Sequence, residues 1–154
     1  MGRDDSRSAA AAQGIGASLR SAHRLYLKLL QDHLGTRGLT VAQYLHLRVL
    51  REQKGLFQNE ISARLGIEKA SSTAVLDALE RDGLIERQRD GEDRRRLKVT
   101  LTGKGEKLAD EMMSFAKQIA SAATDGVDAD DLASFFATMD RVIDNLSRAI
   151  AARR

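Results

Sequence analysis

The chain has 154 residues, the length of one domain or of one domain with a dimerisation extension. Its 42% apolar and 31% charged residues are typical of a globular protein and exclude a disordered chain. It has no cysteine, which excludes disulfides, thiolate nucleophiles and cysteine-bound zinc, and no proline, which favours long uninterrupted helices.

Residues 1–14 are polar and rich in alanine, without a periodic apolar face, and we predict a flexible tail or a frayed helix start there. From Ile15 to Leu34 apolar side chains recur at helical spacing, which predicts a first helix. A capping box then marks the start of a second helix, because Thr40 is followed three positions later by Gln43. The inner stripe of this second helix is formed by Tyr44, Leu47 and Leu50.

Two short helical patterns joined by a glycine follow. Ile61 and Leu65 lie on one side of the first, which Gly66 ends, and we expect Asn59 to cap its start and Phe57 to be a packing residue. The second pattern ends at Gly83, and its buried side is Ser72, Val75, Leu76 and Leu79. Two helices joined by a tight turn that contains glycine predict a helix-turn-helix.

In this motif the second helix enters the major groove of DNA, with its N-terminal residues first. Serine and threonine hydroxyls can bond base edges or phosphates, and a threonine methyl can meet a thymine methyl. The free N–H groups at the helix start also suit a phosphate. The outward-facing residues near this end, which are the candidate DNA contacts, are Lys69, Ala70, Ser71, Thr73 and Ala74.

After Gly83 the pattern changes to that of strands. An extended run begins at Leu84, residues 97–101 alternate between apolar and polar, and Asp90-Gly91 predicts a hairpin turn between the two runs. The arginines of this hairpin suit a narrow minor groove of DNA. The further candidate DNA contacts are therefore Arg94, Arg95 and Arg96. A charge run between strands is often only a solvated turn. The order of two helices followed by a hairpin therefore indicates DNA binding more strongly than the charge does.

Two amphipathic helices complete the chain. Thr102 is the expected cap of the first, whose apolar stripe is Leu108, Met112, Phe115 and Ile119. Gly126 ends this helix, and Asp128 is expected to cap the last one. That last helix carries a continuous apolar stripe of Leu132, Phe135, Phe136, Met139, Val142, Ile143, Leu146 and Ile150.

Residues 93–105 resemble the wing signature of the MarR family, in which Asp-x-Arg precedes a strand and Leu-Thr-x-x-Gly. Residues 79–85 resemble the exit of its recognition helix, and residues 39–44 the start of its second helix; the resemblance covers roughly residues 15–150. It implies a mainly α fold with a small β-hairpin wing. Residues 39–105 would form the winged helix-turn-helix domain, and residues 15–38 and 106–154 the dimerisation helices.

The resemblance also implies a homodimeric, cytoplasmic transcriptional regulator, most simply a repressor, that binds a palindromic double-stranded DNA operator. A small organic effector, such as an anionic aromatic or its thioester, would release the DNA. The effector-binding candidates are His23, Tyr26, Tyr44, Arg48 and Met112. Family members often carry arginine where this chain has Ala74, so we expect more reliance on the wing, on thymine methyl groups and on DNA shape.

Two alternatives stay open, an effector-independent architectural DNA binder and a helical protein-interaction module with a solvated basic wing. The spacings of His23, His33 and His46 are not those of a metal site, so no metal is expected. The sequence has no phosphate-binding glycine loop and no nucleophile elbow. We therefore expect neither an enzyme nor a cofactor, and no membrane partner, because no apolar run reaches about 18 residues.

Overall fold

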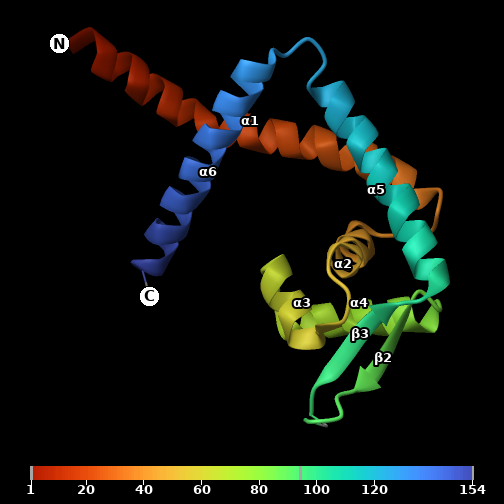
Figure 1. Ribbon diagram of the computed structural model, residues 1–154. Helices are drawn as coiled ribbons and strands as arrows, with labels where there is room; N and C mark the ends of the chain where they lie inside the picture. Colours follow the sequence, from red (N-terminus) through yellow and green to blue (C-terminus); the bar gives the residue numbers. More distant parts are fainter. Residues whose placement is uncertain (1, 94, 154) are drawn as a thin grey trace. The chain divides into compact units, whose positions relative to one another are not determined.

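The computed structural model describes residues 2–93 and 95–153, with side chains from residue 14 onward. Its elements are α1 (Gly2–Gly35), α2 (Val41–Glu52), β1 (Leu56–Phe57), α3 (Gln58–Leu65), α4 (Lys69–Arg81), β2 (Ile85–Arg89), β3 (Leu97–Leu101), α5 (Gly103–Ala123) and α6 (Ala129–Ala151). The chain divides within α5 into two compact units, Met1–Ile119 and Ala120–Arg154. The mainly helical fold class with a small β wing is confirmed (Figure 1).

The winged helix-turn-helix lies within the first unit. Helices α2, α3 and α4 pack on one another, and the hairpin of β2 and β3 follows α4 (Figure 1). Gly66 ends α3 in the left-handed conformation, at a φ of 64°, as its place in the sequence predicts. Ser72, Leu76 and Leu79 are the buried residues of α4, which confirms the predicted inner side.

The sheet has three antiparallel strands in the order β1-β3-β2, one more than the hairpin predicted. The additional strand, β1, pairs Leu56 with Val99 and Phe57 with Lys98. Two residues are too short for any periodic signal, and only the pairing with β3 makes them a strand. The loop between β2 and β3 is closed by a hydrogen bond from the Asp90 N–H to the Arg96 carbonyl.

Two predicted helix starts are wrong. Helix α1 begins at Gly2 rather than near Ile15, in a stretch where four consecutive alanines favour helix. Asn59 does not cap α3, because it already lies inside the helix. The Phe57 N–H instead donates to the Glu60 carboxylate at 2.8 Å, which satisfies an amide just before the helix.

The start of α5 is fixed against the end of α4 by Thr102 and Gly105. The Thr102 hydroxyl accepts a hydrogen bond from the Gly105 N–H at 3.0 Å and donates to the Gly83 carbonyl at 2.8 Å, which confirms Thr102 as the cap. Gly105 is buried, and a Cβ built on it would lie 1.9 Å from the Leu84 carbonyl oxygen. The glycine of the wing signature is therefore required for the close approach of two backbones.

Ion pairs tie the first part of α5 to the winged domain. The Arg51 Nε lies 2.7 Å from Asp110 Oδ1, and Lys54 pairs with Glu106 at 3.3 Å. The hydrogen bond from Arg51 holds the pKa of Asp110 below its usual value. His33 of α1 also stacks on Phe115 of α5, with ring centroids 3.5 Å apart. These contacts make α5 an extension of the first unit up to Ile119.

The second unit contains the end of α5 and α6. The Asp128 carboxylate accepts a hydrogen bond from the Asp130 N–H at 2.8 Å, so the predicted cap of α6 is confirmed. No side chain of α6 is buried among the described residues. Its most exposed apolar residues, each more than half exposed, are Phe135, Phe136, Ile143, Leu146 and Ile150. Among the described residues, no helix is long and apolar enough to cross a membrane.

Candidate DNA-binding surface

The outer side of α4 is exposed as predicted at four of its five candidate positions. Lys69, Ala70, Ser71 and Ala74 are exposed, whereas Thr73 is half-buried. The residue before α4, Glu68, makes no side-chain cap, so the first N–H groups of the helix stay available to an anion. Between Ala70 and Ala74 the exposed side chains are small and uncharged, and Lys69 lies at the N-terminal edge of this surface.

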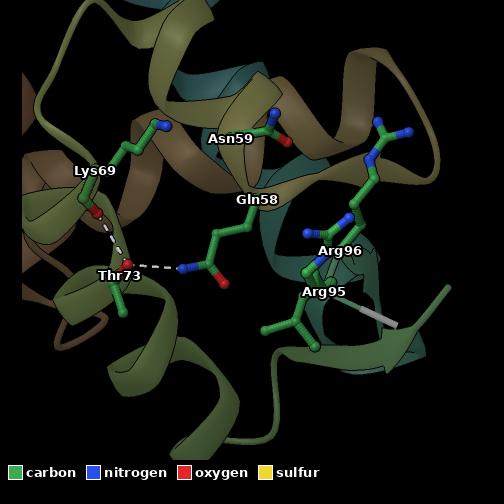
Figure 2. A pocket seen from close by; sticks show the side chains of 7 residues that line it. Gln58, Asn59, Lys69, Thr73, Arg95 and Arg96 are labelled. Atoms are coloured by element: carbon green, nitrogen blue, oxygen red, sulfur yellow. Dashed lines mark hydrogen bonds between the residues drawn. The ribbon is translucent and has the colours of Figure 1, made fainter. Parts of the chain in front are cut away.

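Thr73 differs from the prediction in what its hydroxyl can do. The hydroxyl accepts a hydrogen bond from Gln58 Nε2 at 2.6 Å and donates to the Lys69 carbonyl at 2.9 Å (Figure 2). Both roles of the hydroxyl are therefore used within the protein, and the methyl group is the part left for a ligand. Sequence reasoning missed Gln58, because nothing in its neighbourhood signals that the first residue of α3 reaches α4.

A groove of about 380 Å³ runs between the recognition helix α4, the start of α3 and the base of the wing (Figure 2). It is lined by Gln58, Asn59, Lys69, Thr73, Arg95, Arg96 and Leu97. Three of these side chains are cations and none is a carboxylate. The groove therefore brings together candidate residues from both α4 and the wing. Lys69 and Arg95, for example, are 26 positions apart in the sequence.

The two described arginines of the wing have different surroundings. The side chain of Arg95 is 92% exposed, and its backbone N–H and Nε lie 3.0 and 3.3 Å from Asp93 Oδ1. Arg96 instead stacks on the Phe57 ring, with its guanidinium carbon 3.5 Å from the ring centroid. Asp93 thus orients Arg95, and the packing role of Phe57 is to hold Arg96. The third candidate of the wing, Arg94, lies outside the described residues.

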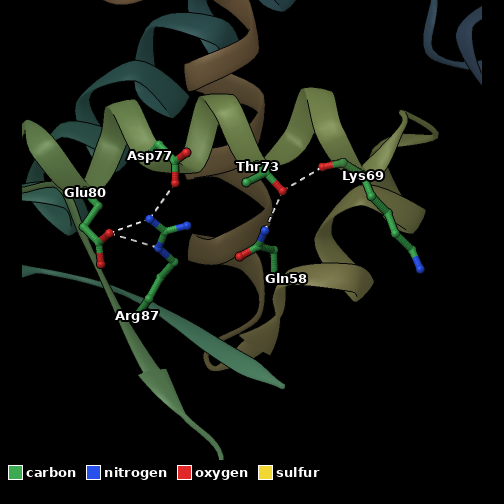
Figure 3. A network of polar contacts seen from close by, with 6 residues as sticks. All are labelled: Gln58, Lys69, Thr73, Asp77, Glu80 and Arg87. Carbon is green, nitrogen blue, oxygen red and sulfur yellow. Dashed lines mark hydrogen bonds and ion pairs between the residues drawn. The ribbon is translucent and has the colours of Figure 1, made fainter. Parts of the chain in front are cut away.

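Arg87 of β2 connects the wing to α4. Its Nη2 lies 2.6 Å from Asp77 Oδ1 and 2.5 Å from Glu80 Oε2, and its Nε lies 3.0 Å from the same Glu80 oxygen (Figure 3). The Arg87 side chain is only 16% exposed. The hydrogen bond from Arg87 holds the pKa of Glu80 below its usual value. Nothing in the sequence around Arg87 signals that its side chain faces the helix.

His46 of α2 is buried against α4. Its Nδ1 lies 2.7 Å from the Ala42 carbonyl oxygen and its Nε2 lies 3.0 Å from Ser72 Oγ. A carbonyl only accepts, so Nδ1 carries the proton and the Ser72 hydroxyl donates to Nε2 in the neutral ring. Burial lowers the pKa of His46, which the bond to Ala42 partly opposes. This histidine therefore fixes Ser72 on the inner side of the recognition helix.

The effector-binding candidates are only partly brought together. Tyr44 is buried, and its pKa is raised chiefly by burial and further by nearby Tyr26, while Arg48 opposes the shift. Arg48 is half-buried, with its Nε 3.3 Å from Glu52 Oε1. Met112 is fully buried, and His23 is exposed on α1. Tyr26, Tyr44 and Arg48 thus form a group, whereas Met112 belongs to the core.

Comparison with known proteins agrees with this geometry. Residues 37–96 match the sequence model of the MarR family. The HTH-type transcriptional regulator TtmR of Methylorubrum extorquens (strain PA1) is 37% identical over 113 residues, 72% of this chain and 56% of that protein. The chain therefore spans little more than half the length of this curated relative.

Two solved structures of bacterial regulators are also similar. One is BpsR of Bordetella bronchiseptica, whose DNA binding is regulated by 6-hydroxynicotinic acid, with 27% identity, a TM-score of 0.73, and 83% of this chain and 97% of that chain covered. The other is the transcriptional regulator PcaV of Streptomyces coelicolor in complex with its natural ligand, with 27% identity, a TM-score of 0.70, and 84% and 89% covered. Residues 37–96 thus carry a MarR family domain, and the fold that surrounds them is similar to those of BpsR and PcaV.

Proposed function

We propose that this protein is a transcriptional regulator, a repressor that binds a palindromic DNA operator as a homodimer and is released by a small organic effector. The observation that carries the proposal is the groove in which Lys69 of α4 and Arg95 and Arg96 of the wing converge. The carboxylates of Asp93 and Glu60 lie 3.3 and 3.8 Å from these two arginines but are not among the residues that line the groove. A DNA backbone that passes this groove would meet three cations. Action on chromosomal DNA also agrees with the cytoplasmic location expected from the sequence.

On DNA, each part of the surface has a separate role. Lys69 and the uncapped N–H groups of α4 would hold a phosphate, and Ser71 would reach the major groove beside Ala70. The exposed Arg95 would enter the neighbouring minor groove. Because the Thr73 hydroxyl is occupied, Thr73 would contribute through its methyl group. Arg96, held on Phe57, would reach only the phosphates at the base of the wing.

The homodimer is supported by apolar surface on both terminal helices. On α1, Leu25 and Leu29 are each more than half exposed, and α6 presents the apolar stripe described above. An apolar patch of this size is costly in water and is typical of an interface. A two-fold dimer would place two α4 helices about one turn of DNA apart, which requires a palindromic operator.

The group of Tyr26, Tyr44 and Arg48 is the proposed place for the effector. A guanidinium beside two phenols suits an anionic aromatic compound, and the ligands named for BpsR and PcaV support a ligand-responsive protein. Such a compound would act by binding better to the dimer whose α4 helices are wrongly spaced for DNA.

The test is binding to the intergenic DNA upstream of the gene, compared with a scrambled duplex, at two salt concentrations. We expect a dimer that prefers the native sequence and loses affinity steeply as salt rises. Steep salt dependence without sequence preference would favour the architectural DNA binder. Absence of any DNA binding would contradict the proposal and favour the protein-interaction module.

A further inference from the structure

Two carboxylates lie on the recognition helix close to its proposed DNA-facing surface. Asp77 follows Ala70 by seven residues and Thr73 by four, so it shares their side of α4. Glu80 lies one further turn along the edge that faces the wing. Their side chains are 55% and 41% exposed. Two negative charges at this place would repel the phosphates of a bound duplex.

Arg87 offsets one of these two negative charges and bonds both carboxylates. Alternation along β2 puts it on the same side as buried Ile85, which is the side packed against α4. Its guanidinium bonds Glu80 through two nitrogens and Asp77 through one, at 2.5–3.0 Å (Figure 3). The Arg87 side chain is 16% exposed, so its end of the contact is screened by salt less than in an ordinary surface ion pair, whereas Asp77 and Glu80 stay more than a third exposed. Charge-assisted bonds of this kind hold their partners in one position.

We propose that Arg87 is a positioning residue for DNA recognition, which keeps the middle of α4 compatible with DNA by holding Asp77 and Glu80 in place and offsetting one of their two negative charges. It does so from β2, so the charge of the recognition helix depends on the wing being docked. The hydrogen bonds that Arg87 makes through Nε and Nη2 all point to the two carboxylates, so the proposed role acts through them and not through a direct contact with DNA. This inference rests on the DNA-binding function proposed above.

The first comparison is between Arg87→Gln and Lys117→Gln. Each removes one positive charge, but Lys117 is exposed on α5 and outside the groove and the ion-pair network. The probe is the duplex that the wild-type protein enriches from a random DNA pool. We expect Arg87→Gln to weaken binding by about tenfold or more, since like charges brought together at an interface are strongly unfavourable. Lys117→Gln should change it by less than about threefold.

The second comparison separates neutralisation from a mechanical tether or a direct DNA contact. In the triple variant Asp77→Asn, Glu80→Gln, Arg87→Gln, binding should return to within about threefold of wild type, because no carboxylate is left to repel DNA. The double variant Asp77→Asn, Glu80→Gln, which keeps Arg87, should bind as tightly as wild type or more tightly. If circular dichroism shows that Arg87→Gln is unfolded, the DNA affinity of the double variant tests the proposal in its place.

Each contrary result overturns a defined statement. Wild-type affinity in a folded Arg87→Gln would refute the role of Arg87. If the triple variant bound DNA as weakly as Arg87→Gln, Arg87 would contact DNA itself. If the double variant Asp77→Asn, Glu80→Gln bound more weakly than wild type, the bonds from Arg87 would act only as a mechanical tether. Failure of the wild-type protein to enrich any duplex would instead overturn the proposed function, and the inference with it.

Discussion

Replacement of Gly105 by alanine should destabilise the protein although alanine is the better helix former. The new Cβ would lie 1.9 Å from the Leu84 carbonyl oxygen, 2.9 Å from the Leu84 carbonyl carbon and 3.3 Å from Leu101 Cδ2. The obstacle is backbone, so the start of α5 must move by about 1 Å for the Cβ to reach a normal separation. That movement opposes the hydrogen bond from the Thr102 N–H to the Leu84 carbonyl, now 3.0 Å long.

The size of the effect follows from three contributions. Overpacking of this kind costs about 1–3 kcal/mol, and a weakened buried hydrogen bond costs about 1 kcal/mol more. The helix propensity of alanine returns roughly 0.5–1 kcal/mol. We therefore expect a net loss of about 1–3.5 kcal/mol, which lowers the midpoint of thermal unfolding by roughly 2–14 °C for a chain of this length.

The assay is thermal unfolding followed by circular dichroism at one fixed protomer concentration, since dimerisation would also stabilise the fold. Gly103→Ala is the matched control, because it lies in the same first turn of α5 and its Cβ would meet nothing within 4 Å. The control should unfold at the wild-type temperature or slightly above it. If Gly105→Ala did the same, the close approach to Leu84 would not limit this position.

Three further predictions concern the wing, the buried histidine and α6. Arg95→Ala should weaken operator binding by ~1–3 kcal/mol and reduce its salt dependence, as measured by fluorescence anisotropy; unchanged affinity and salt slope would exclude Arg95 from the interface. Because burial lowers the pKa of His46 below 6.5, its stabilising effect is complete above that pH and is lost as pH falls through the lower, folded-state pKa. The unfolding midpoint of wild type should therefore fall more between pH 7 and 5 than that of His46→Gln, and equal slopes would contradict this. The pair Phe136→Asp and Leu146→Asp should convert a dimer to monomers in analytical ultracentrifugation, whereas an unchanged dimer would place the interface elsewhere.

Local signals in the sequence predicted much of the fold. The capping box of Thr40 and Gln43 is present with both of its hydrogen bonds, because a cap is decided by residues three positions apart. The buried stripe of α4 and the left-handed Gly66 were predictable for the same reason. Candidate DNA contacts on α4 followed from helical geometry alone, and their role in binding remains a prediction.

Features that depend on distant partners were not predictable. β1 is a strand only because β3 lies beside it, and the Thr73 hydroxyl is occupied only because Gln58 of another helix reaches it. Arg87 resembles any other arginine of the hairpin until the strand is docked on α4. Nor does periodicity distinguish a core position from a ligand contact, which is why Met112 was included among the effector candidates.

The pairing of β1 has a consequence for the order of folding. Leu56 and Val99 are 43 positions apart, whereas β2 and β3 are neighbours in the chain. Closing the longer loop costs more conformational entropy, and only two residues of pairing repay it. The hairpin should therefore form first and β1 should join last, in a chain that has no proline to add a slow isomerisation phase. In the native state the same pairing should also be the first part of the sheet to open, so hydrogen exchange at the Leu56–Phe57 edge should be faster than between β2 and β3.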